Sequence, residues 1–106
     1  SNTEVPKEQD IVDRCIFIML NEAARCLEEG IVENASQLDF AMIMGVGFPP
    51  FLGGLCAYAD KVGLNNVIER LHYFSRVYGK RFEPSPYLMR LSKEKGSFFV
   101  KEDKNA

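Results

Sequence analysis

The stretch that most constrains how this chain can fold runs from Asp10 to Gly30, and its pattern predicts one long helix. The middle of the stretch, residues 15–20, is the unbroken apolar block CIFIML. Polar side chains recur at helical spacing on one face: Arg14, Asn21, Arg25 and Glu28. The helix is therefore polar toward its ends and apolar all round its waist. Because a bare apolar waist is unfavourable in water, we expect other elements to surround this core helix.

The size and charge of the chain narrow the class of protein. With 106 residues, it is expected to form one domain with a substantial core and no second domain. An apolar content of 46% and a charged content of 26% are typical of a globular protein. The net charge of −2 argues against nucleic acid or an anionic membrane as the main partner. No apolar run approaches the roughly 18 residues of a membrane span, and no signal peptide is expected.

The cysteines indicate a compartment rather than a site. Cys15, Cys26 and Cys56 lie on apolar faces of predicted helices, where each is expected to be a small buried hydrophobe. Their odd number and low density are not those of a disulfide framework, which favours a reducing, cytoplasmic location. Cys26, Cys56 and the single histidine, His72, lack the clustered spacing of zinc ligands, so we predict no metal site.

A second, shorter helix is predicted over residues 37–44. Ser36 is a good N-cap, and Asp39 follows three residues later, in the partner position of a capping box. Gly45 is expected to end this helix, because glycine readily adopts the left-handed conformation found at helix ends.

A Gly-Pro corner and a third helix come next. Residues 45–50 read GVGFPP and cannot be helical, because the prolines restrict the backbone and the glycines permit unusual angles. Apolar residues then repeat at helical spacing over residues 51–62, and Gly63 marks the end. Gly53 and Gly54 would fall in the first turn of this helix and weaken it by roughly 1 kcal/mol each. We expect the close approach of another backbone to compensate for this loss.

The last part of the chain predicts two more helices and a short arm. The helix ends have recognisable residues: Asn65 or Asn66 and Gly79 for the first, Ser85-Pro86 and Gly96 for the second. Residues 97–100 are expected to pack as an extended arm. Residues 1–9, with Ser1-Asn2 as an expected cloning remnant, and residues 101–106 are predicted tails around a domain at 10–100. Because no stretch alternates with period two, the predicted class is all-α, with about five helices around a long central one.

Two features could carry chemistry, and each has a structural alternative. Residues 45–47, Gly-Val-Gly, share two glycines with the dinucleotide-binding fingerprint, but that motif follows a strand and opens a helix, so we interpret them as a corner. A basic face gathers on a predicted helix: His72, Arg76 and Lys80, with Arg70 and Arg81 near it. This face could contact the phosphates of a coenzyme or of RNA, although a solvated helix face is the favoured interpretation. Since no nucleophile is paired with a base, no catalytic or cofactor-binding residue is predicted.

Several short motifs follow one another in order along residues 10–100: Asp13-Arg14, Leu20-Asn21-Glu22-Ala23, Glu28-Glu29-Gly30, Asp39, the run from Gly45 to Gly54, and Asp60 before Gly63. In this order they resemble the C-terminal helical domain of 3-hydroxyacyl-CoA dehydrogenases, and most closely the last, second-repeat domain of fatty-acid oxidation complex alpha subunits. The resemblance implies the helical fold of the 6-phosphogluconate dehydrogenase C-terminal domain. It also implies structural roles for a set of turn residues: Gly45, Gly47, Pro49, Pro50, Gly53, Gly54 and Asp60.

The resemblance implies a role in a multifunctional enzyme of fatty-acid β-oxidation. There, an enoyl-CoA hydratase/isomerase region and an NAD-binding dehydrogenase domain precede two tandem helical domains, and NAD and the catalytic His-Glu pair belong to the NAD-binding domain. Copies that complete the active site carry an Asn, implicated in the substrate site, where this chain has Asp13. An ionised carboxylate cannot donate a hydrogen bond to a substrate oxygen and would repel developing negative charge. This copy is therefore interpreted as the non-catalytic, supporting repeat, inactive by itself.

The partners implied by the resemblance are the preceding helical repeat, the NAD-binding domain and a thiolase-type beta subunit. Separated from the preceding helical repeat, the chain is expected to form a symmetric homodimer through the core helix and the helix at 51–62. A stand-alone helical protein-interaction module is the alternative, and a helical nucleic-acid binder comes third.

Overall fold

The computed structural model describes residues 8–47 and 53–99, and these residues form helices and no strand. The described elements are α1 (Glu8–Glu28), α2 (Ala35–Val46), α3 (Leu55–Val62), α4 (Leu64–Tyr78), the short 3-10 helix η2 (Lys80–Phe82) and α5 (Pro86–Glu94). The predicted all-α class is confirmed. None of these helices is both long enough and apolar enough to span a bilayer.

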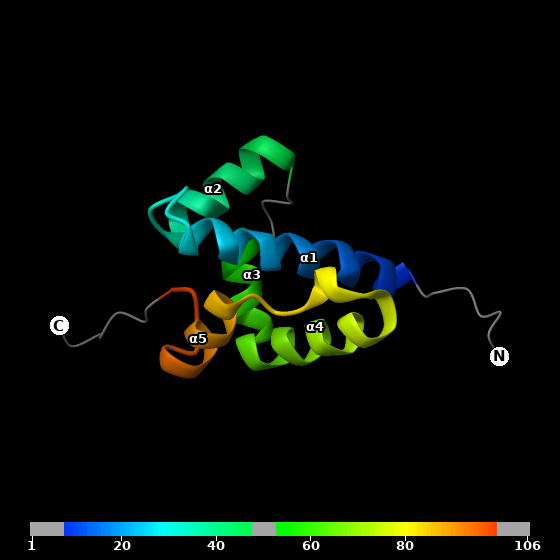
Figure 1. Cartoon of the computed structure of the whole chain (residues 1–106). Helices are drawn as coiled ribbons and strands as arrows, with labels where there is room; N and C mark the ends of the chain where they lie inside the picture. Colours follow the sequence, from blue (N-terminus) through cyan, green and yellow to red (C-terminus); the bar gives the residue numbers. More distant parts are fainter. Residues whose placement is uncertain (1–7, 48–52, 100–106) are drawn as a thin grey trace.

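Helix α1 is the central element, as predicted from its sequence. It runs along the molecule, with α2 on one side and α4 and α5 on the other (Figure 1). It contacts all four of the other α-helices and η2. The core therefore forms around α1, from segments that are far apart in the sequence.

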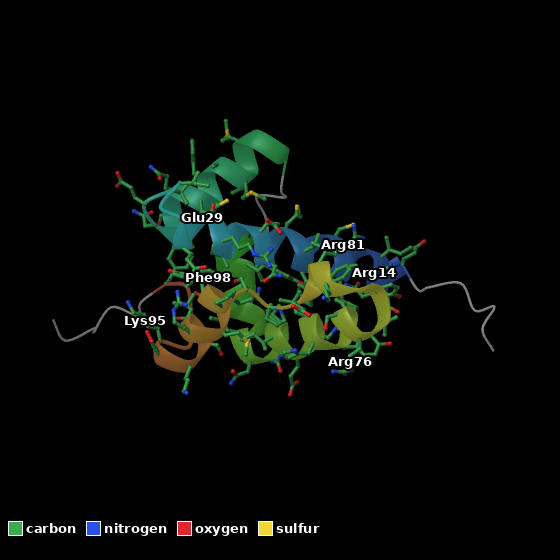
Figure 2. The ribbon with its side chains drawn as sticks, viewed as in Figure 1. Arg14, Glu29, Arg76, Arg81, Lys95 and Phe98 are labelled. Atoms are coloured by element: carbon green, nitrogen blue, oxygen red, sulfur yellow. The ribbon has the colours of Figure 1, made fainter. Side chains whose placement is uncertain are left out.

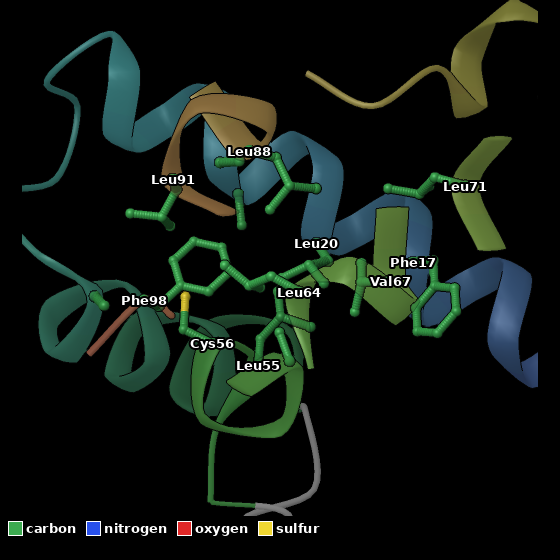
Figure 3. Packing of buried hydrophobic residues seen from close by; sticks show 14 of the residues in the cluster. Phe17, Leu20, Leu55, Cys56, Leu64, Val67, Leu71, Leu88, Leu91 and Phe98 are labelled. Carbon is green, nitrogen blue, oxygen red and sulfur yellow. The ribbon is translucent and has the colours of Figure 1, made fainter. Parts of the chain in front are cut away.

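The core combines aliphatic side chains, several of them drawn in Figure 3, with a cluster of aromatic rings. Leu20 at the middle of α1 is fully buried, as are Leu55 of α3 and Leu88 of α5. Phe74 lies among other rings, with centroid distances of 6.1 Å to Phe17 and 5.6 Å to Phe82. The deep burial of such large apolar side chains is the main source of the stability of the fold.

The waist of α1 is covered on one side rather than all round. Phe17 and Leu20 are buried, whereas Ile16 and Ile18 are half-buried and Cys15 is exposed. The expectation that Cys15 is a buried hydrophobe is therefore wrong. The apolar run does not by itself say how many sides of a helix its neighbours cover.

Helix α2 begins earlier and ends later than its local signals indicate. Its N-cap is Asn34, whose side chain accepts a hydrogen bond from the Gln37 backbone N–H at 2.8 Å, and not Ser36. Gly45 lies inside the helix, which ends at Gly47 with φ +74°. The predicted capping box is thus wrong: with the cap moved to Asn34, the Asp39 side chain is free to reach α3 instead.

Helix α3 also differs at its start. It begins at Leu55, so Gly53 and Gly54 precede the helix and do not weaken its first turn. The predicted start at Phe51, together with Pro49 and Pro50, lies outside the described residues.

Helix α4 begins immediately after α3. Its N-cap is Gly63 rather than Asn65 or Asn66, and the Asn66 side chain donates back to the Val62 carbonyl at 2.9 Å. The single residue between α3 and α4 leaves no room for the predicted asparagine cap.

The start of α5 follows the prediction. The Ser85 hydroxyl accepts a hydrogen bond from the Leu88 N–H at 3.2 Å, and Pro86 occupies the first turn. The helix ends at Glu94 with Lys95 as C-cap, before the predicted Gly96. Phe98 in the segment that follows is buried, so this arm does pack against the core.

Candidate functional site

Asp13, at the position that the resemblance associates with the substrate site, is held by two side chains in this structure. The Gln9 amide donates to its Oδ1 at 2.8 Å, and Arg70 of α4 lies 3.4 Å from its Oδ2. Arg70 also lies 3.6 Å from Asp10, and the Asp13 side chain is only 16% exposed. Asp13 therefore acts here as the centre of a polar link between α1 and α4.

Arg70 is fixed from its other side by aromatic rings. Its guanidinium lies 4.7 Å from the Phe74 ring centroid and 5.6 Å from that of Tyr73. A cation stacked on an aromatic face keeps its orientation, and this orientation serves Asp10 and Asp13. The arrangement can neutralise the Asp13 carboxylate. An ionised Asp13, however, has no hydrogen to donate in place of the amide of the catalytic copies.

Asn21, expected on the polar stripe of α1, is instead fully buried. Its side-chain amide donates to the Glu83 carbonyl at 2.5 Å and accepts from the Ser85 N–H at 2.6 Å. It thus satisfies two backbone groups of the segment between η2 and α5. This residue is structural, and its role could not be found from helical periodicity alone.

Asp39 performs a similar task at the start of α3. Its carboxylate accepts hydrogen bonds from the N–H groups of Cys56 at 2.6 Å and Ala57 at 3.1 Å. These are free donors of the first turn, where a negative charge is favourable. A Cβ added to Gly54 would lie 2.5 Å from the Asp39 carboxylate, so Gly54 provides the space for this cap. The group that approaches Gly54 is thus a side chain and not the expected backbone.

Asp60 fixes the last described segment to α3. Its two carboxylate oxygens accept from the backbone N–H groups of Phe98 at 2.6 Å and Phe99 at 3.0 Å. These bonds place the Phe98 ring in the core.

Burial, with Asp39 and then Asp60 nearby, raises the pKa of the Cys56 thiol far above its ordinary value. Cys56 is accordingly an unreactive core residue.

The other residues singled out from the sequence do not gather into a site. Gly45 and Gly47 belong to the end of α2, and a Cβ added to either would meet open space. His72, Arg76 and Lys80 are exposed along α4 and η2. Within the described residues, no three His, Cys, Asp or Glu side chains lie close enough together to bind a metal ion.

The polar side chains of the interior are therefore used to fix helix ends and loops, and none is paired as a nucleophile with a base. Against this geometry, the family model described as 3-hydroxyacyl-CoA dehydrogenase, C-terminal domain, matches residues 11–104. The chain belongs to this family. The match covers α1 from residue 11 onward and all of α2 to α5.

Three curated relatives of this chain all have the name fatty acid oxidation complex subunit alpha. The chain is 45% identical over 96 residues to the fatty acid oxidation complex subunit alpha of Shewanella sp. (strain MR-4), which covers 90% of this chain and 14% of that protein. It is 45% identical over 89 residues to that of Shewanella sp. (strain ANA-3), covering 84% and 13%. For Shewanella frigidimarina (strain NCIMB 400) the identity is 43% over 91 residues, covering 86% and 13%. The chain thus spans about one seventh of the length of these relatives.

Proposed function

We propose that this chain is the second helical repeat of a fatty acid oxidation complex alpha subunit, and that it supports catalysis without performing it. The observation that carries the proposal is the state of Asp13. Its carboxylate is occupied by Gln9 and Arg70, it has no hydrogen to donate when ionised, and its side chain is largely covered. Such a group links two helices and cannot polarise a substrate carbonyl.

The reaction itself belongs to the rest of the full-length protein in this proposal. There, an NAD-binding domain oxidises 3-hydroxyacyl-CoA, next to an enoyl-CoA hydratase/isomerase region and in the cytoplasm. A thiolase-type beta subunit would be a further partner. This helical repeat would keep the preceding repeat in its active arrangement.

The surface through which the two repeats would pair is best assigned to α2. The expected faces are largely used inside the fold, since Phe17 of α1 and Leu55 of α3 are buried. Phe40 and Met44 of α2 are instead 67% and 70% exposed, one turn apart on the same helix. An isolated copy would then form a homodimer through the same α2 face, because a second copy can cover these two exposed apolar side chains.

A reconstitution experiment tests the proposal. The Shewanella sp. (strain MR-4) alpha subunit would be shortened by the segment that aligns with this chain, and this chain would be added back. We expect saturable binding and a recovery of NAD-dependent oxidation of a 3-hydroxyacyl-CoA. Phe40→Glu/Met44→Glu should abolish both effects, whereas Met89→Glu on α5, where Met89 is 42% exposed, should leave them unchanged.

The rival assignment, a stand-alone interaction module, predicts no binding to the shortened subunit.

A second test concerns Asp13→Asn, which restores the amide of the catalytic copies. We expect no binding of acetoacetyl-CoA by calorimetry and a stability change below about 1 kcal/mol, because the Asp13–Arg70 pair is long and its Arg70 side chain is 39% exposed. Measurable binding of that compound by the variant would contradict the supporting role.

A further inference from the structure

A small pocket lies where the first half of α1 meets η2, and neither Asp13 nor any residue of α2 lines it. It has a volume of about 290 Å³, and its lining consists of Ile11, Arg14, Cys15, Ile18, Arg81 and Phe82. Two of these side chains are guanidinium groups and three are large and apolar. Arg14 and Arg81 come from different elements and lie on the same side of the molecule (Figure 2).

Arg14 is held in place, and its Nε–H donor is not used by the described part of the chain. Its guanidinium lies over the Tyr78 ring, 4.1 Å from the ring centroid, which restricts its movement. Its Nε is buried, and among the described residues no acceptor forms a hydrogen bond with it. This Nε–H is closed off from solvent, so the donors that remain for an acceptor from outside the fold are the terminal nitrogens of the guanidinium.

The charge around the pocket is not compensated by the described part of the chain. No described carboxylate forms an ion pair with Arg14 or Arg81, and the nearby Asp10 and Asp13 face Arg70 instead. Arg81 is exposed and lies 5.2 Å from the ring centroid of Phe82. Two unpaired guanidinium groups beside an apolar wall attract an anion with an apolar part.

We propose that this pocket binds a small organic oxyanion, a carboxylate or a phosphate ester with a short apolar chain. The two guanidinium groups bind the oxyanion. The apolar chain lies against Ile11, Ile18 and Phe82. This site is independent of the proposed pairing through α2, so either can fail while the other holds.

Side-chain NMR on the whole chain tests the site. The Nε–Hε signal of Arg14 would be followed during titration with butyl phosphate, butyrate and inorganic phosphate. We expect a saturable shift with an organic anion and a dissociation constant of about 1 mM, with weaker binding of inorganic phosphate. Tighter binding of butyl phosphate than of butyrate would identify phosphate esters as the ligand class, and the reverse order would identify carboxylates.

Three variants decide whether the pocket is responsible. Arg81→Gln removes an exposed charge, and Arg14→Lys keeps the charge but removes the planar guanidinium; each should weaken binding by about tenfold or more. Arg76→Gln, on an exposed part of α4 and not among the residues that line the pocket, is the matched control and should bind like the wild type. An equal loss in Arg76→Gln, no saturable shift with either organic anion, or inorganic phosphate binding as tightly as butyl phosphate would each overturn the proposal.

Discussion

Replacing Gly54 by alanine should destabilise the fold far more than an ordinary glycine substitution. The added Cβ would lie 2.5 Å from Oδ2 and 2.6 Å from Cβ of Asp39, whose side chain is buried and has little room to move. Asp39 can avoid this overlap only by withdrawing from the N–H groups of Cys56 and Ala57. The substitution therefore removes the cap of α3 as well as straining the backbone.

The size of the effect follows from these two contributions. Gly54 has φ +99° and ψ 162°, a conformation that costs a residue with a Cβ about 1–3 kcal/mol. Each lost hydrogen bond to the carboxylate adds about 1.5–3 kcal/mol. The two bonds alone amount to at least about 3 kcal/mol, a large fraction of the roughly 5–15 kcal/mol that stabilises a typical domain.

Gly79→Ala is the matched control. Gly79 has φ +117° and ψ 177°, the same kind of backbone conformation, but an added Cβ would meet nothing within 4 Å. Relative to this control, Gly54→Ala should lower the melting temperature by a further 12–24 °C or so, measured by circular dichroism. In an Asp39→Ala background this extra loss should become smaller, because the carboxylate hydrogen bonds are already absent and only the contact with the Cβ of residue 39 remains. If Gly54→Ala and Gly79→Ala have the same melting temperature, the assigned role of Asp39 is wrong.

Three more predictions concern other buried groups. Asn21→Leu leaves two backbone groups without partners and should reduce the free energy of unfolding in urea by about 2–4 kcal/mol; unchanged stability would contradict this. Asp60→Ala should raise the hydrogen exchange of the Phe98 amide by about tenfold or more, well above the change at Val67 of α4, and an equal change at both would show only global destabilisation. Burial raises the pKa of the Cys56 thiol, so the unfolded chain loses this proton at a lower pH than the folded chain does. The free energy of unfolding should therefore fall as the pH rises above about 8.5, by up to about 1.4 kcal/mol per pH unit. Cys56→Ala should lack this part of the alkaline decline, and an identical pH dependence in both proteins would refute the assignment.

The fold class could be predicted from the sequence because its signals are local. The apolar run of α1, the glycine after α4 and the Ser85-Pro86 start of α5 each act within one or two turns of helix. The start of α2 was predicted at the wrong residue for the same reason. Asn34 and Ser36 are both good caps two residues apart, and the local pattern does not choose between them.

The roles of the buried polar residues could not be predicted in this way. Asn21 has the spacing of a solvent-facing residue, and only the arrival of Ser85, 64 positions later, makes its burial favourable. Asp39 fits a local capping box, but its actual partners lie 17 and 18 residues away. The oxyanion pocket likewise combines Arg14 of α1 with Arg81 of η2. Helical periodicity contains no information on such distant pairs.

The bonds of Asn21 also have a consequence for how the chain folds during synthesis. Glu83 and Ser85 lie 62 and 64 residues after Asn21, and the Glu28–Arg90 ion pair joins the same two parts of the chain across 62 residues. At about 5–20 residues per second, the ribosome takes roughly 3–13 s to supply these partners. During that interval the apolar side of α1 has already been made but has nothing to complete it. The first helix therefore depends on the last, and a chaperone that shields α1 in the meantime should increase the yield of folded protein.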